Sequence, residues 1–177
     1  MTDNTQTVSP DGFASALNKI LERFDLQNIE SADLVMRETT KNMFGSIIED
    51  TPVGDFDPAH AGTLKGGWEI TTGSAYSGLT GRMTPRRTRK GLRIPRLITK
   101  QGSKDIYLTN NVPYINVAEY GGYKKNPKLG TLDKRTGRYV IRSKGGFSKQ
   151  APKGMVRKNM AKAGHFLTEA ANKVLKG

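Results

Sequence analysis

Residues 50–68 read DTPVGDFDPAHAGTLKGGW, and residues 69–72 continue as EITT. Because a residue that precedes proline disfavours the α conformation, Pro52 predicts the end of a helix. The glycines, aspartates and prolines of residues 53–67 predict a loop. From Trp68 to Thr72 the β-favouring residues alternate, which predicts a strand. The chain therefore changes here from a helical part to a part built around a β-sheet.

Two amphipathic helices are expected before Pro52. Residues 1–8 are expected to form a disordered tail, after which Ser9 is a suitable N-cap and Pro10 a suitable first helical residue. Apolar residues recur on one face of this first helix: Phe13, Leu17, Ile20, Leu21 and Phe24. Ser31 is expected to cap the second helix, which carries the apolar residues Leu34, Val35, Met43, Ile47 and Ile48.

Two further strands and a closing helix are expected after Thr72. Alternation predicts strands at residues 105–110 and 138–142, and residues 114–120 fit a short helix or a turn. The closing helix is expected over residues 153–176. Its apolar stripe consists of Met155, Val156, Met160, Ala163, Leu167, Ala171 and Val174. Residues 121–137 and 143–154 are expected to be loops.

These elements predict one α+β domain over residues 9–177. A small, mostly antiparallel sheet would be covered on one face by the N-terminal and C-terminal helices. Residues 78–104 are rich in basic residues and poor in apolar ones, so we expect them to form a long basic loop or hairpin that extends from the domain.

The charge of the chain is uneven. The net charge is +13 over 177 residues, but residues 1–60 carry −7 and residues 82–177 carry +20. Such an imbalance suggests contact with nucleic acid or another anionic surface, and equally suggests that the acidic part of one copy meets the basic part of the next.

Composition argues against several classes of protein. The chain has no cysteine, which excludes disulfides, thiolate metal sites and cysteine nucleophiles. Its polar start does not resemble a signal peptide, and no apolar run approaches the length of a membrane span. We therefore expect a soluble protein made in a cytoplasm, with no membrane partner.

The sequence offers no convincing catalytic, cofactor or metal site. Asp50, Asp55 and Asp57 lie near His60, but the remaining ligands of a calcium loop are missing, so a solvated acidic loop is the better interpretation. Glu119 has no second carboxylate nearby for acid–base chemistry, and there is no Ser/His/Asp order. We expect no enzyme activity.

The glycines of the loop before the first strand, and the single tryptophan, are interpreted as structural residues. Gly62, Gly66 and Gly67 are expected to serve turn geometry rather than phosphate binding. Trp68 is interpreted as a core aromatic of the first strand in preference to an anchor at a subunit contact.

The basic extension is the clearest candidate for contact with DNA or a partner protein. Its candidate contact residues are Arg82, Arg86, Arg87, Arg89, Lys90, Arg93, Arg96 and Lys100. Lysine and arginine contact phosphate without regard to sequence. The segment has no aromatic residue on which a base could stack, which argues against recognition of single strands.

Three short motifs occur in a fixed order. They are TPV…GTLKGGW at residues 51–68, PY…AEYGG at residues 113–122, and APKGMV at residues 151–156 before the closing helix. Together they resemble the tail-completion or neck proteins of tailed bacteriophages, including the minor tail protein Z type. The motif residues that carry the resemblance are Pro52, Val53, Gly62, Leu64, Trp68, Tyr114, Glu119, Tyr120, Gly121, Ala151 and Pro152.

The resemblance implies a structural virion protein at the head–tail junction, assembled in the host cytoplasm. Such proteins usually form rings of about six copies around the DNA channel, in heterologous contact with one another. The implied partners are further copies of the chain, the head connector or stopper, the tail terminator or tail-tube proteins, and the DNA end.

The chain departs from the family pattern in two places. One is the basic extension at residues 78–104, which is long for the family, and the other is in the first motif. In the family an Asp-Thr-Gly follows the Pro-Val almost at once, whereas here residues 54–61 separate Val53 from Gly62 and Ala61 replaces the aspartate. A stand-alone basic DNA-binding protein is the alternative, although no DNA-reading motif is recognisable.

Overall fold

The computed structural model describes residues 29–54, 61–78, 92–99, 101–126 and 128–176. The predicted N-terminal tail and first helix lie outside these residues, and so does most of the basic extension. The described residues form five helices and several small antiparallel sheets, which confirms the predicted α+β class.

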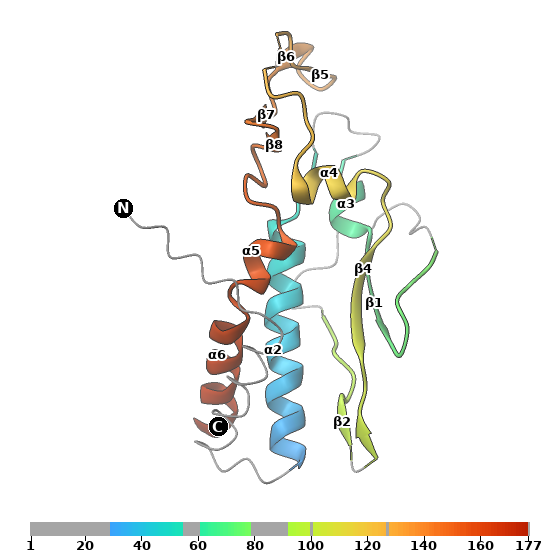
Figure 1. Cartoon of the computed structure of the whole chain (residues 1–177), viewed down its shortest axis with the longest axis vertical. Coiled ribbons are helices and arrows are strands. Elements are labelled where there is room, and N and C mark those ends of the chain that lie inside the picture. The colour runs from blue at the N-terminus through green and yellow to red at the C-terminus, as the bar shows by residue number, and fades with distance from the viewer. Residues whose placement is uncertain (1–28, 55–60, 79–91, 100, 127, 177) are drawn as a thin grey trace.

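The long helix α2 spans Ile29–Asp50 and is the axis of the fold (Figure 1). It ends where Pro52 predicted, and the Thr51 hydroxyl donates to the carbonyl of Ile47 at 2.7 Å just beyond the last turn. The predicted cap at Ser31 is wrong, because the chain is already helical at Ile29.

The C-terminal helices α5 (Val156–Met160) and α6 (Ala163–Lys176) replace the single closing helix that was predicted. Helix α6 lies antiparallel beside α2 (Figure 1). Their contact is formed by small and branched side chains, namely Val35, Leu167, Ala170 and Ala171. The break at residues 161–162 changes the helical phase, so Met160 is 48% exposed and does not belong to the predicted stripe.

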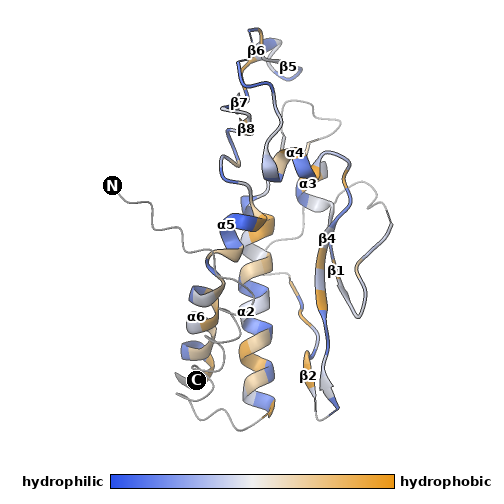
Figure 2. Cartoon of the chain, viewed as in Figure 1, coloured by the Kyte–Doolittle hydropathy of each residue, from blue (hydrophilic) through white to orange (hydrophobic). Residues whose placement is uncertain are grey.

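The main sheet consists of β1 (Trp68–Thr72) and β4 (Ile106–Asn110), which pair antiparallel with Trp68 opposite Asn110. Both strands were predicted. They share one hydrophobic core with α2, and its buried members include Phe44, Ile48, Leu64, Trp68, Leu97 and Met155. Figure 2 shows this apolar colour along α2 and β4.

The prediction of one sheet is wrong, because the described strands form four separate two-stranded sheets. Strand β2 (Ile98–Thr99) pairs with β3 (Gly102–Ser103), and β7 (Ser143–Lys144) pairs with β8 (Phe147–Ser148). The predicted strand at residues 138–142 is shorter, β6 (Arg138–Val140), and pairs with β5 (Thr131–Asp133) in an exposed hairpin. That hairpin has no buried apolar face with which to join the main sheet.

Two short helices complete the described fold: α3 (Thr63–Gly66) and α4 (Ile115–Tyr120). Helix α3 lies inside the predicted 53–67 loop, and α4 confirms the short helix that was one of two alternatives for residues 114–120. The β5–β6 hairpin lies at one end of the molecule, beyond α4 and far from α6 (Figure 1). Among the described helices none is long and apolar enough to cross a membrane.

Candidate interaction surface

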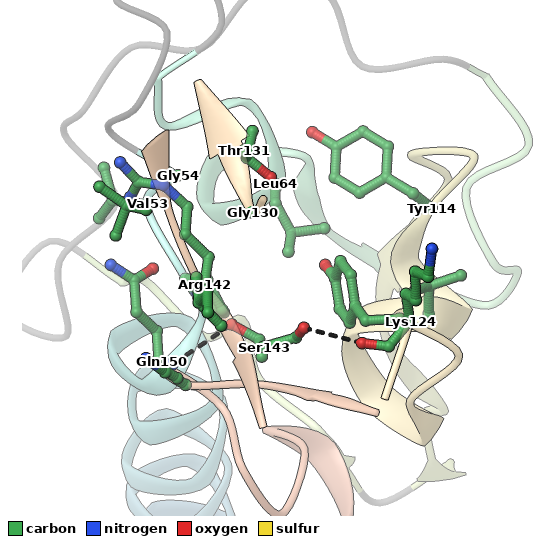
Figure 3. A pocket seen from close by; sticks show the side chains of 17 residues that line it. Val53, Gly54, Leu64, Tyr114, Lys124, Gly130, Thr131, Arg142, Ser143 and Gln150 are labelled. Atoms are coloured by element: carbon green, nitrogen blue, oxygen red, sulfur yellow. Dashed lines mark hydrogen bonds between the residues drawn. The ribbon is translucent and has the colours of Figure 1, made fainter. Parts of the chain in front are cut away.

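Four of the motif residues meet at one cavity of about 690 Å3 at the base of the β5–β6 hairpin (Figure 3). Pro52 and Val53 come from the loop after α2, Leu64 comes from α3, and Tyr114 comes from the residue before α4. Figure 3 shows the Tyr114 ring directed across the cavity towards Leu64 and Thr131. The motifs are far apart in sequence, and the fold brings them to one place.

The cavity combines apolar walls with positive charge. Its basic residues are Lys124, Arg142 and Lys149, and no acidic side chain is among the described residues that line it. Burial raises the pKa of Tyr123, and burial together with the neighbouring Tyr123 raises that of Tyr114. Both phenols therefore stay protonated near neutral pH and can donate hydrogen bonds. The chemistry suits an apolar or acidic protein segment.

Glu119 connects α4 to the start of α5. Its carboxylate accepts hydrogen bonds from the backbone amides of Met155 (2.8 Å), Val156 (2.9 Å) and Arg157 (2.8 Å). The amides at a helix start have no partner within the helix, and a carboxylate also complements the helix dipole. Glu119 is only 4% exposed, so it is a structural residue of the fold.

Arg157 and Gly154 complete this connection. The Arg157 guanidinium donates to the Glu119 carbonyl at 2.7 Å and lies 5.0 Å from the centre of the Tyr120 ring. Gly154 has a φ of 74°, and a Cβ there would lie 2.6 Å from the Glu119 carbonyl oxygen. We call Glu119, Gly154 and Arg157 the Glu119 clasp.

The electrostatics of the Glu119 clasp favour the ionised carboxylate. Burial alone would raise the pKa of Glu119, but the hydrogen bonds from the three backbone amides and from the Arg157 side chain outweigh it, so the pKa is lowered. The carboxylate is therefore charged at neutral pH, as its capping role requires.

The other motif residues also have structural roles. Trp68 is buried and its indole N–H donates to the Thr51 hydroxyl at 2.9 Å, which supports the core interpretation over a surface anchor. Gly62 has a φ of 79° and its amide donates to the Val53 carbonyl, so it serves a turn as predicted. Gly121, also at positive φ, follows α4, and its amide donates to the carbonyl of Val117.

Ala151 and Pro152 lie at the entrance to α5. Ala151 is buried, whereas Pro152 is exposed and forms an isolated bridge with Gly154. These two residues therefore place the backbone that meets Glu119.

The β5–β6 hairpin exposes more apolar surface than any strand of the main sheet. The exposed apolar residues of the hairpin and its flanks are Leu129 (76%), Leu132 (41%), Tyr139 (63%), Val140 (38%) and Ile141 (41%). Leu132 and Tyr139 are opposite each other in the register, so they share one face. Thr131 and Val140 are likewise paired, and they line the cavity on the other face.

Asp133 holds the turn of this hairpin. Its carboxylate accepts from the amides of Arg135 (3.0 Å) and Thr136 (3.3 Å) and pairs with Arg142 at 2.9 Å. Burial would raise its pKa, but these two amides and the charges of Arg135 and Arg142 lower it. The sequence reasoning missed this residue, although an aspartate followed by Gly137 between β-prone segments is a hairpin signal.

Asp33 was also not predicted from the sequence, and it holds the part of the basic extension around Leu97 and Ile98 against α2. Its buried carboxylate accepts from the amides of Leu97 (2.6 Å) and Ile98 (2.8 Å). Arg96 lies 3.8 Å from the same carboxylate, and Arg93 is exposed. A single aspartate on a helix gives no local sequence signal for a contact more than 60 residues away.

Most of the candidate contacts of the basic extension lie outside the described residues, namely Arg82, Arg86, Arg87, Arg89, Lys90 and Lys100. The same holds for Asp55, Asp57 and His60 of the acidic cluster. Asp50, its remaining member, pairs with Lys158 (3.0 Å) and accepts from Asn159 (2.7 Å). Burial would raise the Asp50 pKa, but these contacts lower it. Within the described ranges, no three His, Asp or Glu residues are grouped as metal ligands.

No protein-family model, curated protein or solved structure matches this chain. The motifs and the surface just described are therefore the basis for a function.

Proposed function

We propose that this chain is a structural virion protein of the head–tail junction of a tailed bacteriophage, without enzymatic activity. In this proposal it is one copy of a homo-oligomeric ring, of about six copies, that surrounds the DNA channel. The ring completes the tail or adapts it to the head connector or stopper, and it meets the tail terminator or tail-tube proteins. The ordered TPV, EYGG and APKGMV motifs are what connect the chain to this class.

The observation that carries the proposal is the β5–β6 hairpin with its exposed Leu132–Tyr139 face. Contiguous apolar patches larger than a few hundred Å2 usually mark interaction sites on monomeric proteins, and several exposed apolar side chains gather on this hairpin and its flanks. A projecting element on one side of a chain is suited to a heterologous contact, in which it meets a different surface of the next copy. Repetition of such a contact closes into a ring when the rotation between copies allows it.

The cavity at the hairpin base supports the same function. It joins residues of two separated motifs in one wall, namely Pro52, Val53 and Leu64 of the first and Tyr114 of the second. A neck protein needs such fixed surfaces because its function is to bind neighbouring proteins, and no catalytic step is involved. The opposite charges of residues 1–60 and 82–177 favour head-to-tail association between copies.

The test is the mass of the purified protein by light scattering at low and high salt, with negative-stain images of the same sample. We expect a closed ring near six times the 19.4 kDa of one chain, or a concentration-dependent equilibrium towards it. The double variant Leu132→Asp and Tyr139→Asp should remain folded and shift to monomer. Met160→Asp is the matched control, because Met160 is about as exposed but lies on α5.

A strictly monomeric wild-type protein under all these conditions would overturn the ring. The alternative, a stand-alone basic DNA-binding protein, would then be favoured. An independent check is gene position, which for this function lies between capsid or connector genes and tail-tube genes.

A further inference from the structure

A second hollow of about 600 Å3 lies beside the cavity at the hairpin base, on the same projecting part of the chain. Ile141, Ser143 and Lys149 line both. The hollow gathers four lysines from two segments of the chain, namely Lys125 and Lys128 from the first and Lys144 and Lys149 from the second. All four are exposed, and the other described lining residues are Asn126 and Gly145.

The charge around this hollow is almost entirely positive. Residues 121–150 contain nine lysines and arginines and a single acidic residue, Asp133. Asp133 is buried, and its carboxylate is occupied by two backbone amides and by Arg142. No acidic side chain among the described lining residues therefore neutralises the four lysines.

We propose that this four-lysine hollow binds the phosphate backbone of duplex DNA. Lysine is a compact, hydrated point charge with three rotatable donors, so it can contact phosphate without demanding one geometry. Four exposed lysines spread over separate segments fit a row of phosphates better than one small anion. Since phosphate contacts carry no sequence information, the binding is sequence-independent.

Duplex DNA is favoured over a single strand because no aromatic residue is among the described residues lining the hollow. Proteins that hold single strands combine positive charge with aromatic rings on which bases stack. The residues that line the hollow lie between positions 125 and 149 and are not part of the basic extension at residues 78–104, so the hollow is a candidate DNA contact in its own right. It does not require the ring, and it is consistent with a protein that surrounds a DNA channel.

The experiment is fluorescence anisotropy of a labelled random-sequence DNA duplex with the full chain, at a series of salt concentrations around the physiological value. The test variant is Lys125→Gln, Lys128→Gln and Lys144→Gln together. The matched control removes three exposed lysines that lie outside both the hollow and the basic extension, Lys153→Gln, Lys162→Gln and Lys173→Gln, and so has the same net charge. Thermal melting and light scattering establish that both variants keep the fold and the oligomeric state of the wild type.

We expect the test variant to bind at least about tenfold more weakly than the wild type near physiological salt, and the control to be weakened much less. The slope of log K against log salt becomes shallower by about 0.9 for each phosphate that the protein no longer neutralises, so it should change by up to about 2.7 in the test variant. A third variant with arginine at positions 125, 128 and 144 should keep the wild-type affinity and slope.

Three results would overturn the proposal. The first is an equal weakening in the test variant and the control, which would mean that net charge alone drives binding. The second is wild-type affinity in the test variant. The third is poly-glutamate that binds as tightly as the duplex and depends on the same three lysines, which would assign the hollow to an acidic protein. None of these results bears on ring formation, which light scattering measures separately.

Discussion

Replacement of Glu119 by alanine is expected to destabilise the protein strongly. The change removes the acceptor of three backbone hydrogen bonds at the start of α5, each between 2.8 and 2.9 Å. If each of the three amides loses about 1 to 1.5 kcal/mol net, the free energy of unfolding falls by about 3 to 4.5 kcal/mol. Arg157 is half-exposed and can turn to water, so we add nothing for it. For a chain of this length, Tm should fall by about 10 °C.

Urea unfolding monitored by far-ultraviolet circular dichroism and by the fluorescence of Trp68, the single tryptophan, measures this destabilisation. Glu119→Gln keeps one acceptor oxygen and should fall between alanine and wild type. Glu169→Ala is the matched control, because Glu169 is exposed on α6 and its replacement should change stability by less than about 0.5 kcal/mol. A destabilisation below about 1 kcal/mol for Glu119→Ala would refute the capping role derived from the Glu119 clasp.

Three further outcomes follow from the same contacts. Folding lowers the pKa of Glu119 below its unfolded value of 4.5, so the ionised carboxylate stabilises the fold above pH 4.5, and this stabilisation is lost as the pH falls through the folded pKa. The free energy of unfolding should therefore fall less steeply with decreasing pH below 4.5 in Glu119→Gln than in the wild type. Gly154→Ala, where a Cβ would overlap the Glu119 carbonyl, should cost about 2 kcal/mol or more in urea unfolding, whereas Gly145→Ala, where the space is open, should cost only about 1 kcal/mol. Trp68→Phe should cost about 1 to 2 kcal/mol, and a double-mutant cycle with Thr51→Val should show coupling through the indole hydrogen bond; additive effects would contradict that bond.

The elements that were predictable from sequence are those set by local signals. Pro52 fixes the end of α2, and alternation of β-favouring residues gives β1 and β4 within one residue of their ends. The errors arose where tertiary contacts decide. The start of α5 depends on Glu119, which lies 36 to 38 residues earlier, so the closing helix could not be delimited from its own apolar stripe.

The candidate interaction surface was predictable from the sequence in part. Pro52, Val53, Leu64 and Tyr114 were selected from motif order, and the structure brings them to one cavity, but their meeting there is not visible in a one-dimensional pattern. The strand β5 was missed because Thr131, Leu132 and Asp133 are too few for a periodicity. The four-lysine hollow was missed for a similar reason, since its lysines are scattered through two segments that the sequence marks only as basic loops.

The Glu119 clasp also divides the chain into a body and a replaceable part. The backbone leaves the body after Tyr120 and returns at Gly154, which lies directly against Glu119. Lengthening a chain segment between two fixed ends costs little, about 0.6 kcal/mol for each doubling of its length. The segment between Tyr120 and Gly154 can therefore be lengthened, shortened or exchanged while the rest of the fold stays the same. In the proposed function, one scaffold could in this way be fitted to a different neighbour by changes in a single continuous stretch of the gene.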